Sequence, residues 1–452
     1  MAREIRLNAF DMNCVGHLQQ GMWRHPRDRS RDYTSLEHWA GLARTLERGL
    51  FDGVFLADVV GVYDVFRGSA AAAIAQAVQV PVNDPLLLVP GMAQVTEHLG
   101  FGVTCNLTYE PPYLFARRMS TLDHLTRGRI GWNIVTGYLD SAARAMGLER
   151  QPEHDRRYDI AEEYMDLVYR LWEGSWEDGA VLRDAASGRY ADPARVHAVS
   201  HDGHWTCHGM HLCEPSPQRT PVLYQAGAST RGRQFAATHA ECVFLNSQPK
   251  PLVKSLVADL RARAEAAGRD PRDVLVFLGV TVVLGDTDAD AEARFAEYRQ
   301  YASIDGALAH FSASVGIDLD EFDPDAPIRP AQTQSNQSNL EAITTRSETA
   351  WTVRGLTERM PLGSRNVPIV GGPARVADEL QAWVEQCDVD GFNLSRVVVP
   401  ESFADVVDLL VPELQARGVY KRAYAPGSLR EKLFGRARLP ATHPAARRRA
   451  RR

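Results

Sequence analysis

Polar and titratable side chains follow several short apolar runs of the sequence, and their types suit acid–base chemistry. They are Asp11, Asn13, Cys14 and His17 after the first run, Asp58, Tyr63 and Asp64 after the second, and Cys105, Asn106, Thr136, Gly137 and Tyr138 after the third and fourth. An imidazole with a pKa near neutrality both donates and accepts hydrogen bonds, so His17 is a candidate for moving a proton. Cys14 fits a pocket wall, or simply a small buried residue, better than a nucleophile, because no basic partner other than His17 is apparent.

A turn with the sequence QAGASTRGR resembles a phosphate cradle. Gly227 permits a close backbone approach, Ser229 can cap the helix that follows, and the free N–H groups of a helix N-terminus attract an anion. His154 and Tyr158 are four residues apart, so they share a face if a helix begins near His154. An ordinary capped turn, a capping histidine and a core tyrosine would give the same patterns.

The run from His197 to Cys213 holds five histidines and two cysteines, yet its spacing does not specify a metal site. Zinc needs three or four ligands at about 2.0–2.3 Å. Alternate residues of a strand face opposite sides, so a hairpin need not bring these side chains together. We therefore expect a surface hairpin and no bound metal. The sequence also lacks a GxSxG elbow, an HExxH motif and the glycine loops that bind nucleotides.

Eight strand-like segments, most of them followed by a helical pattern, must position these side chains. The strands are expected at residues 5–10, 51–57, 101–106, 129–136, 222–226, 242–245, 274–284 and 392–399, and clear helical patterns at 33–49, 84–98, 113–125 and 158–172. Such alternation gives a parallel sheet covered on both faces. Eight units favour an α/β fold of the (β/α)8 TIM-barrel type over an open doubly wound sheet, which would also predict a glycine fingerprint after the first strand.

Two polar segments interrupt this alternation, one at about 177–220 that looks hairpin-bearing and one at about 302–365. Long loops in compact barrels are usually lids or binding loops, so both insertions are expected at the carboxyl ends of the strands, where barrel active sites are built. Residues 1–436 are thus predicted to form one barrel domain. The arginine-rich residues 437–452 are predicted to be a disordered tail, with nucleic-acid or membrane-surface binding as the alternative.

The composition places the chain among water-soluble globular proteins. Hydrophobic residues make up 44% and charged residues 24%, and the net charge of −6 offers no broad basic surface to nucleic acid. No apolar stretch is long enough for a membrane span, and no apolar signal segment precedes the first strand. The six cysteines lack framework spacing, so free thiols and a cytoplasmic location are expected.

Seven motifs together resemble the nitrilotriacetate-monooxygenase branch of the bacterial luciferase-like FMN-dependent monooxygenases. They are NAFDMNCVGH, FDGVFLADVVGVYDVFRG, VPVNDP, ARRMSTLDHLTRGRIGWNIVTG, EHDRRYD, LCEPSPQRTPVLYQAGAS and DGFNL, and the match extends from about residue 4 to residue 436. The resemblance implies a luciferase-like barrel and reduced FMN as a cosubstrate. It also implies a separate NAD(P)H-dependent flavin reductase, in agreement with the missing dinucleotide fingerprint.

The resemblance also assigns site residues. By position, FMN would be held by Asp58, Thr136, Gly137, Tyr138, His154, Tyr158, Gly227, Ala228 and Ser229, with His154, Tyr158 and the 227–229 turn at its phosphate. The pocket over the reactive face of the flavin would be lined by Cys14, His17, Tyr63, Gln79 and His310. Tyr138 departs from the alkane-oxidising members, which this chain otherwise resembles and which carry a histidine there.

The implied reaction is oxidation of a small apolar organic substrate by molecular oxygen. The resemblance favours terminal hydroxylation of a long-chain alkane, and dimethyl sulfide or another organosulfur compound is the alternative. The protein does the placing and the exclusion of water, while the cofactor supplies the difficult chemistry. A deazaflavin-dependent oxidoreductase, a non-catalytic FMN-storing relative and a metal-dependent hydrolase remain rival hypotheses. Members of the family commonly pair, so a homodimer or homotetramer is expected.

Overall fold

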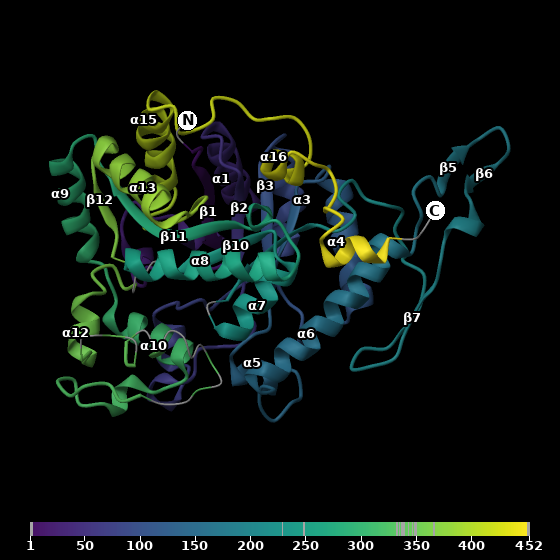
Figure 1. Ribbon diagram of the computed structural model, residues 1–452. Coiled ribbons are helices and arrows are strands. Elements are labelled where there is room, and N and C mark those ends of the chain that lie inside the picture. Colours follow the sequence, from purple (N-terminus) through teal and green to yellow (C-terminus); the bar gives the residue numbers. More distant parts are fainter. Residues whose placement is uncertain are drawn as a thin grey trace.

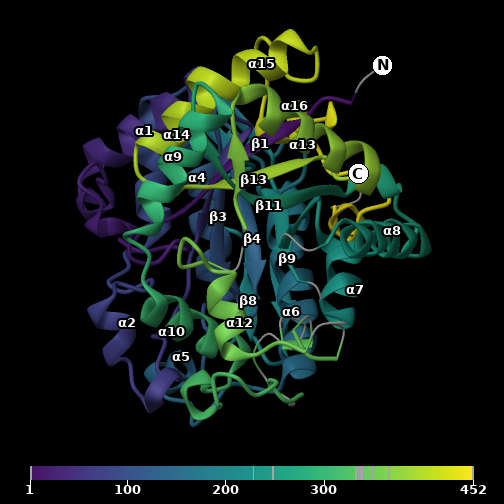
Figure 2. The same cartoon turned by 90° about the vertical axis from the view of Figure 1, so that its left-hand side faces the viewer.

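The computed structural model describes residues 3–449, except residues 228, 247–248, 331–332, 334, 336–339, 342, 346, 348–349 and 365–366. Within these residues, eight parallel strands form a closed barrel surrounded by helices (Figures 1 and 2). The strands are β1 (Arg6–Met12), β2 (Gly53–Ala57), β3 (Gly100–Asn106), β4 (Ile130–Val135), β9 (Val222–Ala226), β10 (Cys242–Asn246), β11 (Leu275–Leu284) and β13 (Gly391–Ser395). Neighbours pair in that order, except that β13 lies between β11 and β1.

Helices follow the barrel strands and cover the outside of the barrel. The longer ones are α1 (Leu36–Arg48), α4 (Pro112–Leu125), α6 (His154–Tyr169), α7 (Thr230–His239), α8 (Lys250–Ala266), α9 (Asp288–Arg299), α10 (Ile304–Val315) and α13 (Pro373–Cys387). The shorter ones are α2 (Ala71–Ala75), α3 (Val89–Gln94), α5 (Asp140–Ala145), α12 (Val353–Glu358), α14 (Glu401–Asp405), α15 (Val411–Ala416) and α16 (Leu429–Phe434). No helix formed by the described residues is both long and apolar enough to cross a bilayer.

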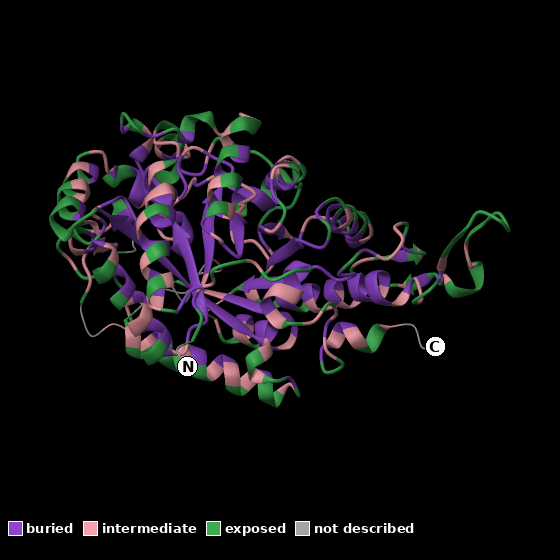
Figure 3. Cartoon of the chain, turned by 90° about the horizontal axis from the view of Figure 1, so that it is seen from above, coloured by how far each residue is buried: buried purple, intermediate pink, exposed green. Residues whose placement is uncertain are grey.

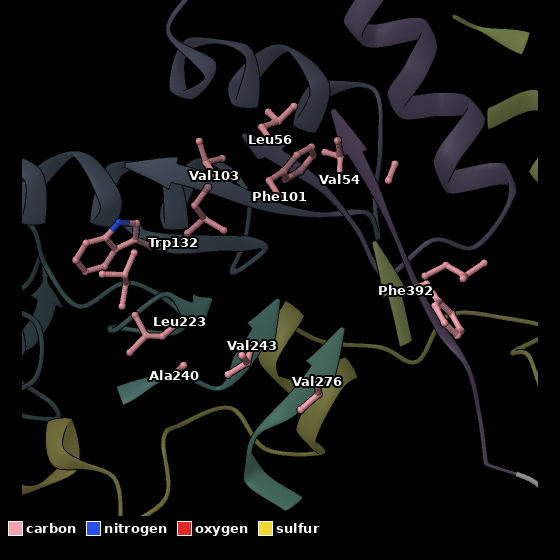
Figure 4. Packing of buried hydrophobic residues seen from close by; sticks show 14 of the residues in the cluster. Val54, Leu56, Phe101, Val103, Trp132, Leu223, Ala240, Val243, Val276 and Phe392 are labelled. Atoms are coloured by element: carbon pink, nitrogen blue, oxygen red, sulfur yellow. The ribbon is translucent and has the colours of Figure 1, made fainter. Parts of the chain in front are cut away.

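The strands are buried on both sides, which explains why each reads as an almost continuous apolar run. All ten residues of β11 are buried. Alternate side chains point outward into a layer shared with the helices, and Figure 4 shows part of that layer around Val103, Trp132 and Val243. In Figure 3 the strands are buried while the outer faces of the helices are exposed.

The other side chains of the strands fill the barrel. Phe10, Phe55, Tyr224 and Phe277 belong to this interior cluster, and the ring centroids of Phe10 and Phe55 are 5.5 Å apart. Leu429 and Leu433 of α16 belong to the same cluster and close the amino-terminal end of the barrel. The barrel is therefore a packed core, and only its carboxyl-terminal rim is left to build a site.

The predicted barrel and all eight predicted strands are confirmed, with ends shifted by a few residues. One helix was expected at 84–98, but the chain forms a 3-10 turn, η4 (Pro85–Leu88), and then α3. Each of the two segments carries a proline in its first turn, and a proline is tolerated there but not inside a helix. The short strand β12 (Ile369–Gly371), which pairs with the last three residues of β11, was not predicted.

The first insertion lies elsewhere than expected. It contains two small hairpins, β5–β6 (Val181–Asp184 and Arg189–Ala191) and β7–β8 (Val199–His201 and Cys207–Gly209). It follows α6 and packs on the outside of α4 and α6: His201 Nε2 lies 3.0 Å from Glu163, and Ser120 Oγ lies 2.9 Å from His211 Nε2. The insertion interrupts a connection from a helix to the next strand, so it does not lie at the carboxyl-terminal rim of the barrel. The hairpin β5–β6 projects from the body (Figures 1 and 3).

The second insertion does lie over the carboxyl ends of the strands, the lower side of Figure 1, where α10 and α12 are found. Its residues reach the candidate pocket: Ser335 Oγ donates to the carbonyl oxygen of Tyr138 at 3.3 Å. This insertion therefore forms part of the wall around the carboxyl-terminal rim of the barrel.

The sequence predicted a disordered tail from residue 437, but residues 437–449 pack against the body. Leu439 and Ala445 are buried, and the side chain of His443 is fully enclosed. Arg438 and Arg449 both contact the buried carboxylate of Glu173, at 2.8 and 3.1 Å. Of the arginines that suggested a solvated tail, Arg448 and Arg449 thus have acidic partners, Asp166 and Glu173, on other elements.

Candidate active site

The loop after β1 brings His17 over the barrel interior. The ring of His17 packs edge-on against Phe10, with centroids 4.6 Å apart, and is 3% exposed. Its Nδ1 atom is buried and has no hydrogen-bond partner among the described residues. Burial, together with the positive charge of Arg396, holds the pKa of His17 well below its ordinary value. A neutral imidazole at this position has one N–H donor and one acceptor.

Two loops distant in sequence meet beside His17. Residues Cys14 and Val82 form a bridge, as do Gly16 and Val78. A Cβ atom at Gly16 would lie 2.3 Å from the carbonyl oxygen of Ala77, so only glycine permits this approach. The contact places Gln79 next to the loop that follows β1.

Gln79 is the centre of a polar network with a defined direction. Its Nε2 atom donates to the carbonyl oxygen of His17 at 2.9 Å and lies 3.4 Å from His310 Nε2. Its Oε1 atom accepts from the hydroxyl of Tyr63 at 2.6 Å. The Tyr63 hydroxyl has a single hydrogen, so the 2.9 Å bond between Tyr63 and Tyr138 is donated by Tyr138. Four of the five predicted pocket residues, His17, Tyr63, Gln79 and His310, are thereby connected.

Cys14, the fifth, is buried in the same loop, where its thiol donates to the carbonyl oxygen of Gly16 at 3.4 Å. Burial raises the pKa of Cys14 far above its ordinary value, although the charge of Arg396 opposes this. The side chain therefore remains a thiol, which suits the wall of a pocket rather than a nucleophile.

Apolar side chains surround the network on the outer side. Tyr63 and Tyr138 pack in a cluster that includes Phe66, Val78, Leu139, Ala309 and Ala313 from the loop after β2, α5 and α10. Few of these side chains are large, and none of those named here besides the tyrosines carries a polar atom. The surroundings of the network are therefore apolar, as the binding of an apolar substrate would require.

Asp58, directly after β2, lies on the same rim. Burial and the neighbouring charge of Asp84 raise the pKa of Asp58 to about 7. A carboxyl group whose pKa is higher in the folded than in the unfolded chain stabilises the fold below the unfolded pKa, and this stabilisation is lost as the pH rises through the folded pKa.

We therefore expect the free energy of unfolding to decrease between pH 4 and pH 7 more steeply in the natural protein than in an Asp58→Asn variant. The difference should be at most about 1.4 kcal/mol for each pH unit. Urea unfolding of both proteins across this range measures it. Parallel profiles would show that Asp58 ionises normally.

Thr136 and Gly137 follow β4. Gly137 has a φ of +69°, and a Cβ atom there would lie 2.5 Å from Asn106 Nδ2, so the turn requires glycine. The carbonyl oxygen of Thr136 accepts from the hydroxyl of Thr108 at 2.8 Å. The two residues thus form a tight turn on the same rim as Asp58.

The predicted phosphate residues converge at the amino-terminal ends of α6 and α7. Ser229 caps α7, its hydroxyl accepting from the N–H of Gly232 at 3.0 Å, and a hydrogen bond also joins Ser229 and Tyr158. The rings of His154 and Tyr158 pack at 5.2 Å. A Cβ atom at Gly232 would lie 2.8 Å from the Tyr158 hydroxyl and 2.9 Å from Ser229 Oγ. Gly227 adjoins this turn, and Ala228 lies outside the described residues.

One buried charged residue of this rim was not predicted. Arg396, directly after β13, pairs with Asp11 at 2.6 Å, and both side chains are buried. Its guanidinium also donates to the carbonyl oxygens of Cys14 and Val15, so it fixes the loop that carries His17. The last strand was predicted to run to residue 399, which placed Arg396 inside it. The strand ends at Ser395, so Arg396 is in fact a polar residue that follows a strand, like the others of the rim.

Three of the five histidines of the first insertion pair separately with acidic side chains. His197 contacts Glu177 at 2.7 Å, and His208 contacts Asp202 at 3.0 Å. Across the part of the chain that the structure describes, no three His, Cys, Asp or Glu side chains are grouped to hold a metal ion.

A closed parallel barrel whose polar side chains gather at the carboxyl ends of the strands defines the class of (β/α)8-barrel enzymes. The family model described as "Luciferase-like monooxygenase" matches residues 18–389. The chain belongs to the luciferase-like monooxygenase family, and it is a monooxygenase.

Two relatives are similar along nearly the whole chain. The dimethyl-sulfide monooxygenase of Hyphomicrobium sulfonivorans is 50% identical over 99% of this chain and 94% of its own length. The long-chain alkane monooxygenase of Geobacillus thermodenitrificans is 48% identical over 99% of this chain and 98% of its own. A crystal structure of a long-chain alkane monooxygenase has a TM-score of 0.92 and covers 99% of this chain and 100% of the other.

A third similar structure is that of a riboflavin lyase, solved with modified FMN and riboflavin. It is 36% identical, has a TM-score of 0.94, and covers 99% of this chain and 100% of the lyase. The two monooxygenases differ by only two percentage points in identity, so the comparison does not choose between an alkane and a sulfide as substrate.

Proposed function

We propose that this protein is a two-component monooxygenase that uses reduced FMN and molecular oxygen to oxidise a small apolar substrate, with a long-chain alkane as the first candidate. The observation that carries this proposal is the directed network from Tyr138 through Tyr63 to Gln79, beside a buried neutral histidine and an apolar wall. Such a site combines a dry space with one controlled proton donor and acceptor.

The residues present fit FMN. A phosphate is attracted to the free N–H groups at the start of α7, where hydroxyl groups of Tyr158 and Ser229 meet. Gly232 leaves this end of the helix open, because a Cβ atom would fill the space beside both hydroxyls. When bound, the flavin supplies the reaction with oxygen, while the chain binds it, excludes water and holds the proton near His17.

Gly232→Ala is expected to weaken FMN binding by about tenfold or more and to change riboflavin binding little, because a charged group loses its hydrogen bonds. Dissociation constants from fluorescence quenching of the two flavins measure this. Gly41→Ala is the control, since a Cβ atom on that helical residue meets nothing within 4 Å. Equal weakening for both flavins would contradict a phosphate site at α7.

Dimethyl sulfide or another organosulfur compound is the second candidate substrate. The hydroxyls of Tyr63 and Tyr138 present polar atoms beside the apolar wall, and a small substrate with one polarisable atom could contact them. The dimethyl-sulfide monooxygenase is as similar to this chain as the alkane monooxygenase to within two percentage points of identity, which keeps this substrate as a candidate.

The reduced flavin is proposed to come from a separate NAD(P)H-dependent reductase, because the sequence has no dinucleotide fingerprint of its own.

A homodimer or homotetramer remains a prediction, for which light scattering is the measurement. All six cysteines are free thiols, which supports the proposed cytoplasmic location.

Oxygen consumption by the purified protein tests the function, with reduced FMN supplied by an unrelated flavin reductase. Linear alkanes, dimethyl sulfide and aryl sulfones form the substrate panel, and products are followed by mass spectrometry. Formation of one oxidised product supports the proposal and selects the substrate class. No change in the reoxidation rate of reduced FMN in the presence of the protein would contradict it.

A further inference from the structure

The two helices that carry the candidate phosphate site are joined at their opposite ends as well. The amino-terminal ends of α6 and α7 hold Tyr158 and Ser229. The last residue of α7 is His239, which lies against the carboxyl-terminal part of α6. The distance between the two hydroxyls at one end therefore depends on how the helices are held at the other.

His239 connects the helices through both of its ring nitrogens. Its Nε2 atom lies 2.7 Å from Glu162 Oε2, and its Nδ1 atom lies 3.1 Å from the hydroxyl of Tyr169. The Tyr169 hydroxyl has a donor hydrogen, so Nδ1 accepts and Nε2 donates to the carboxylate. Burial alone would raise the pKa of Glu162, but His239 and Arg231 hold it below its ordinary value. The link is thus a partly buried, charge-assisted one.

Aromatic packing continues from His239 to the site. The ring of His239 lies 4.7 Å from that of Phe235, and Phe235 lies 5.5 Å from Tyr158. Interiors packed in this way transmit small displacements. A displacement of His239 would therefore be transmitted through Phe235 to the Tyr158 ring.

The C-terminal segment, residues 437–449, locks this end of the helix pair. His443 donates from Nε2 to the main-chain carbonyl oxygen of His239 at 2.8 Å, and its ring packs on Tyr169. At the end of α6, a Cβ atom on Gly174 would lie 2.7 Å from the carbonyl oxygen of Arg448, so the segment rests closely on this turn. Figure 1 shows the yellow C-terminal helix against the end of α6.

We propose that His239, held in place by the C-terminal segment, is a positioning residue that sets α7 against α6 so that the Tyr158 hydroxyl and Ser229 together receive the phosphate of the flavin. The inference rests on the proposed function and deepens it. Hydrogen bonds weaken steeply beyond their normal range, so a slide of α7 by about 1 Å would separate the pair. The isoalloxazine ring has no part in this contact.

The test compares FMN with riboflavin, which lacks the phosphate. In the double variant Tyr169→Phe/His239→Phe, both polar links from His239 to α6 are removed without stranding the tyrosine hydroxyl, while the pair between Arg231 of α7 and Glu162 of α6 is kept. The dissociation constant for FMN is expected to rise about tenfold, and that for riboflavin less than twofold. His239→Gln can still donate to Glu162 and accept from Tyr169, so it should restore the natural ratio.

Arg48→Ala is the control, because Arg48 of α1 pairs with Asp408 and has no contact with α6, α7 or residues 437–449 among the described interactions. It should leave the ratio of the two dissociation constants unchanged. The inference is overturned if the folded double variant keeps the natural ratio or loses affinity for both flavins equally. If the natural protein itself binds both flavins equally or neither of them, the proposed phosphate site fails first and the inference with it.

Discussion

Replacing His17 by asparagine is expected to lower product formation about 10²- to 10⁴-fold, the range over which a positioned proton donor or acceptor usually acts. The imidazole is buried and neutral, with one buried ring nitrogen unpartnered among the described residues. An asparagine amide fills similar space but has no titratable nitrogen. Oxygen consumption should continue with release of hydrogen peroxide, because His17 is not among the residues proposed to bind FMN and those proposed for its phosphate lie at α6 and α7.

The measurement is the ratio of product formed to oxygen consumed under saturating substrate. His98→Asn serves as the control, since His98 stacks on Tyr424 at the amino-terminal end of the barrel. That variant should keep the natural ratio. Full coupling in the His17→Asn variant would remove His17 from the proposed chemistry.

The second large effect concerns a buried ion pair at the amino-terminal end of the barrel. Arg430 makes two bonds to the carboxylate of Glu241, at 2.7 and 2.9 Å, and neither side chain is exposed to solvent beyond 1%. Arg430→Met leaves the carboxylate buried and unpaired, so the free energy of unfolding is expected to decrease by about 3–5 kcal/mol. Urea unfolding measures the change.

Two comparisons make this prediction specific. Arg48→Met breaks an exposed pair with Asp408 and should cost less than about 1 kcal/mol. The double variant Arg430→Met/Glu241→Gln removes the stranded charge and should be more stable than Arg430→Met alone. If the single variant Arg430→Met were as stable as the natural protein, the pair would contribute nothing to the free energy of unfolding.

The barrel could be predicted because each strand is buried on both faces, which leaves a readable apolar run such as residues 275–284. Strand β12 escaped prediction because it has three residues and pairs with the sheet along one side only. The C-terminal segment was misjudged for a different reason. The sequence shows its arginines side by side but not which residues they pair with. The partners Glu173 and Asp166 lie more than 200 residues earlier in the chain.

The rule that polar residues follow strands located Asp58, His17 and Tyr138 on one rim. It could not find Gln79 or His310, which lie on a loop and in an insertion and were supplied by the family resemblance. Gln79 and His310 are separated by 231 positions, and the position of Gln79 depends on the approach of two loops at Gly16. The direction of the hydrogen bonds in the network required coordinates.

Labelled oxygen gives the most direct test of the central claim. The protein is supplied with reduced FMN, ¹⁸O2 and the substrate that most stimulates oxygen consumption, and the product is analysed by mass spectrometry. We predict that each product molecule carries one ¹⁸O atom and that omission of the flavin abolishes product. Product without the label, or product formed equally well without flavin, would contradict a flavin-dependent monooxygenase.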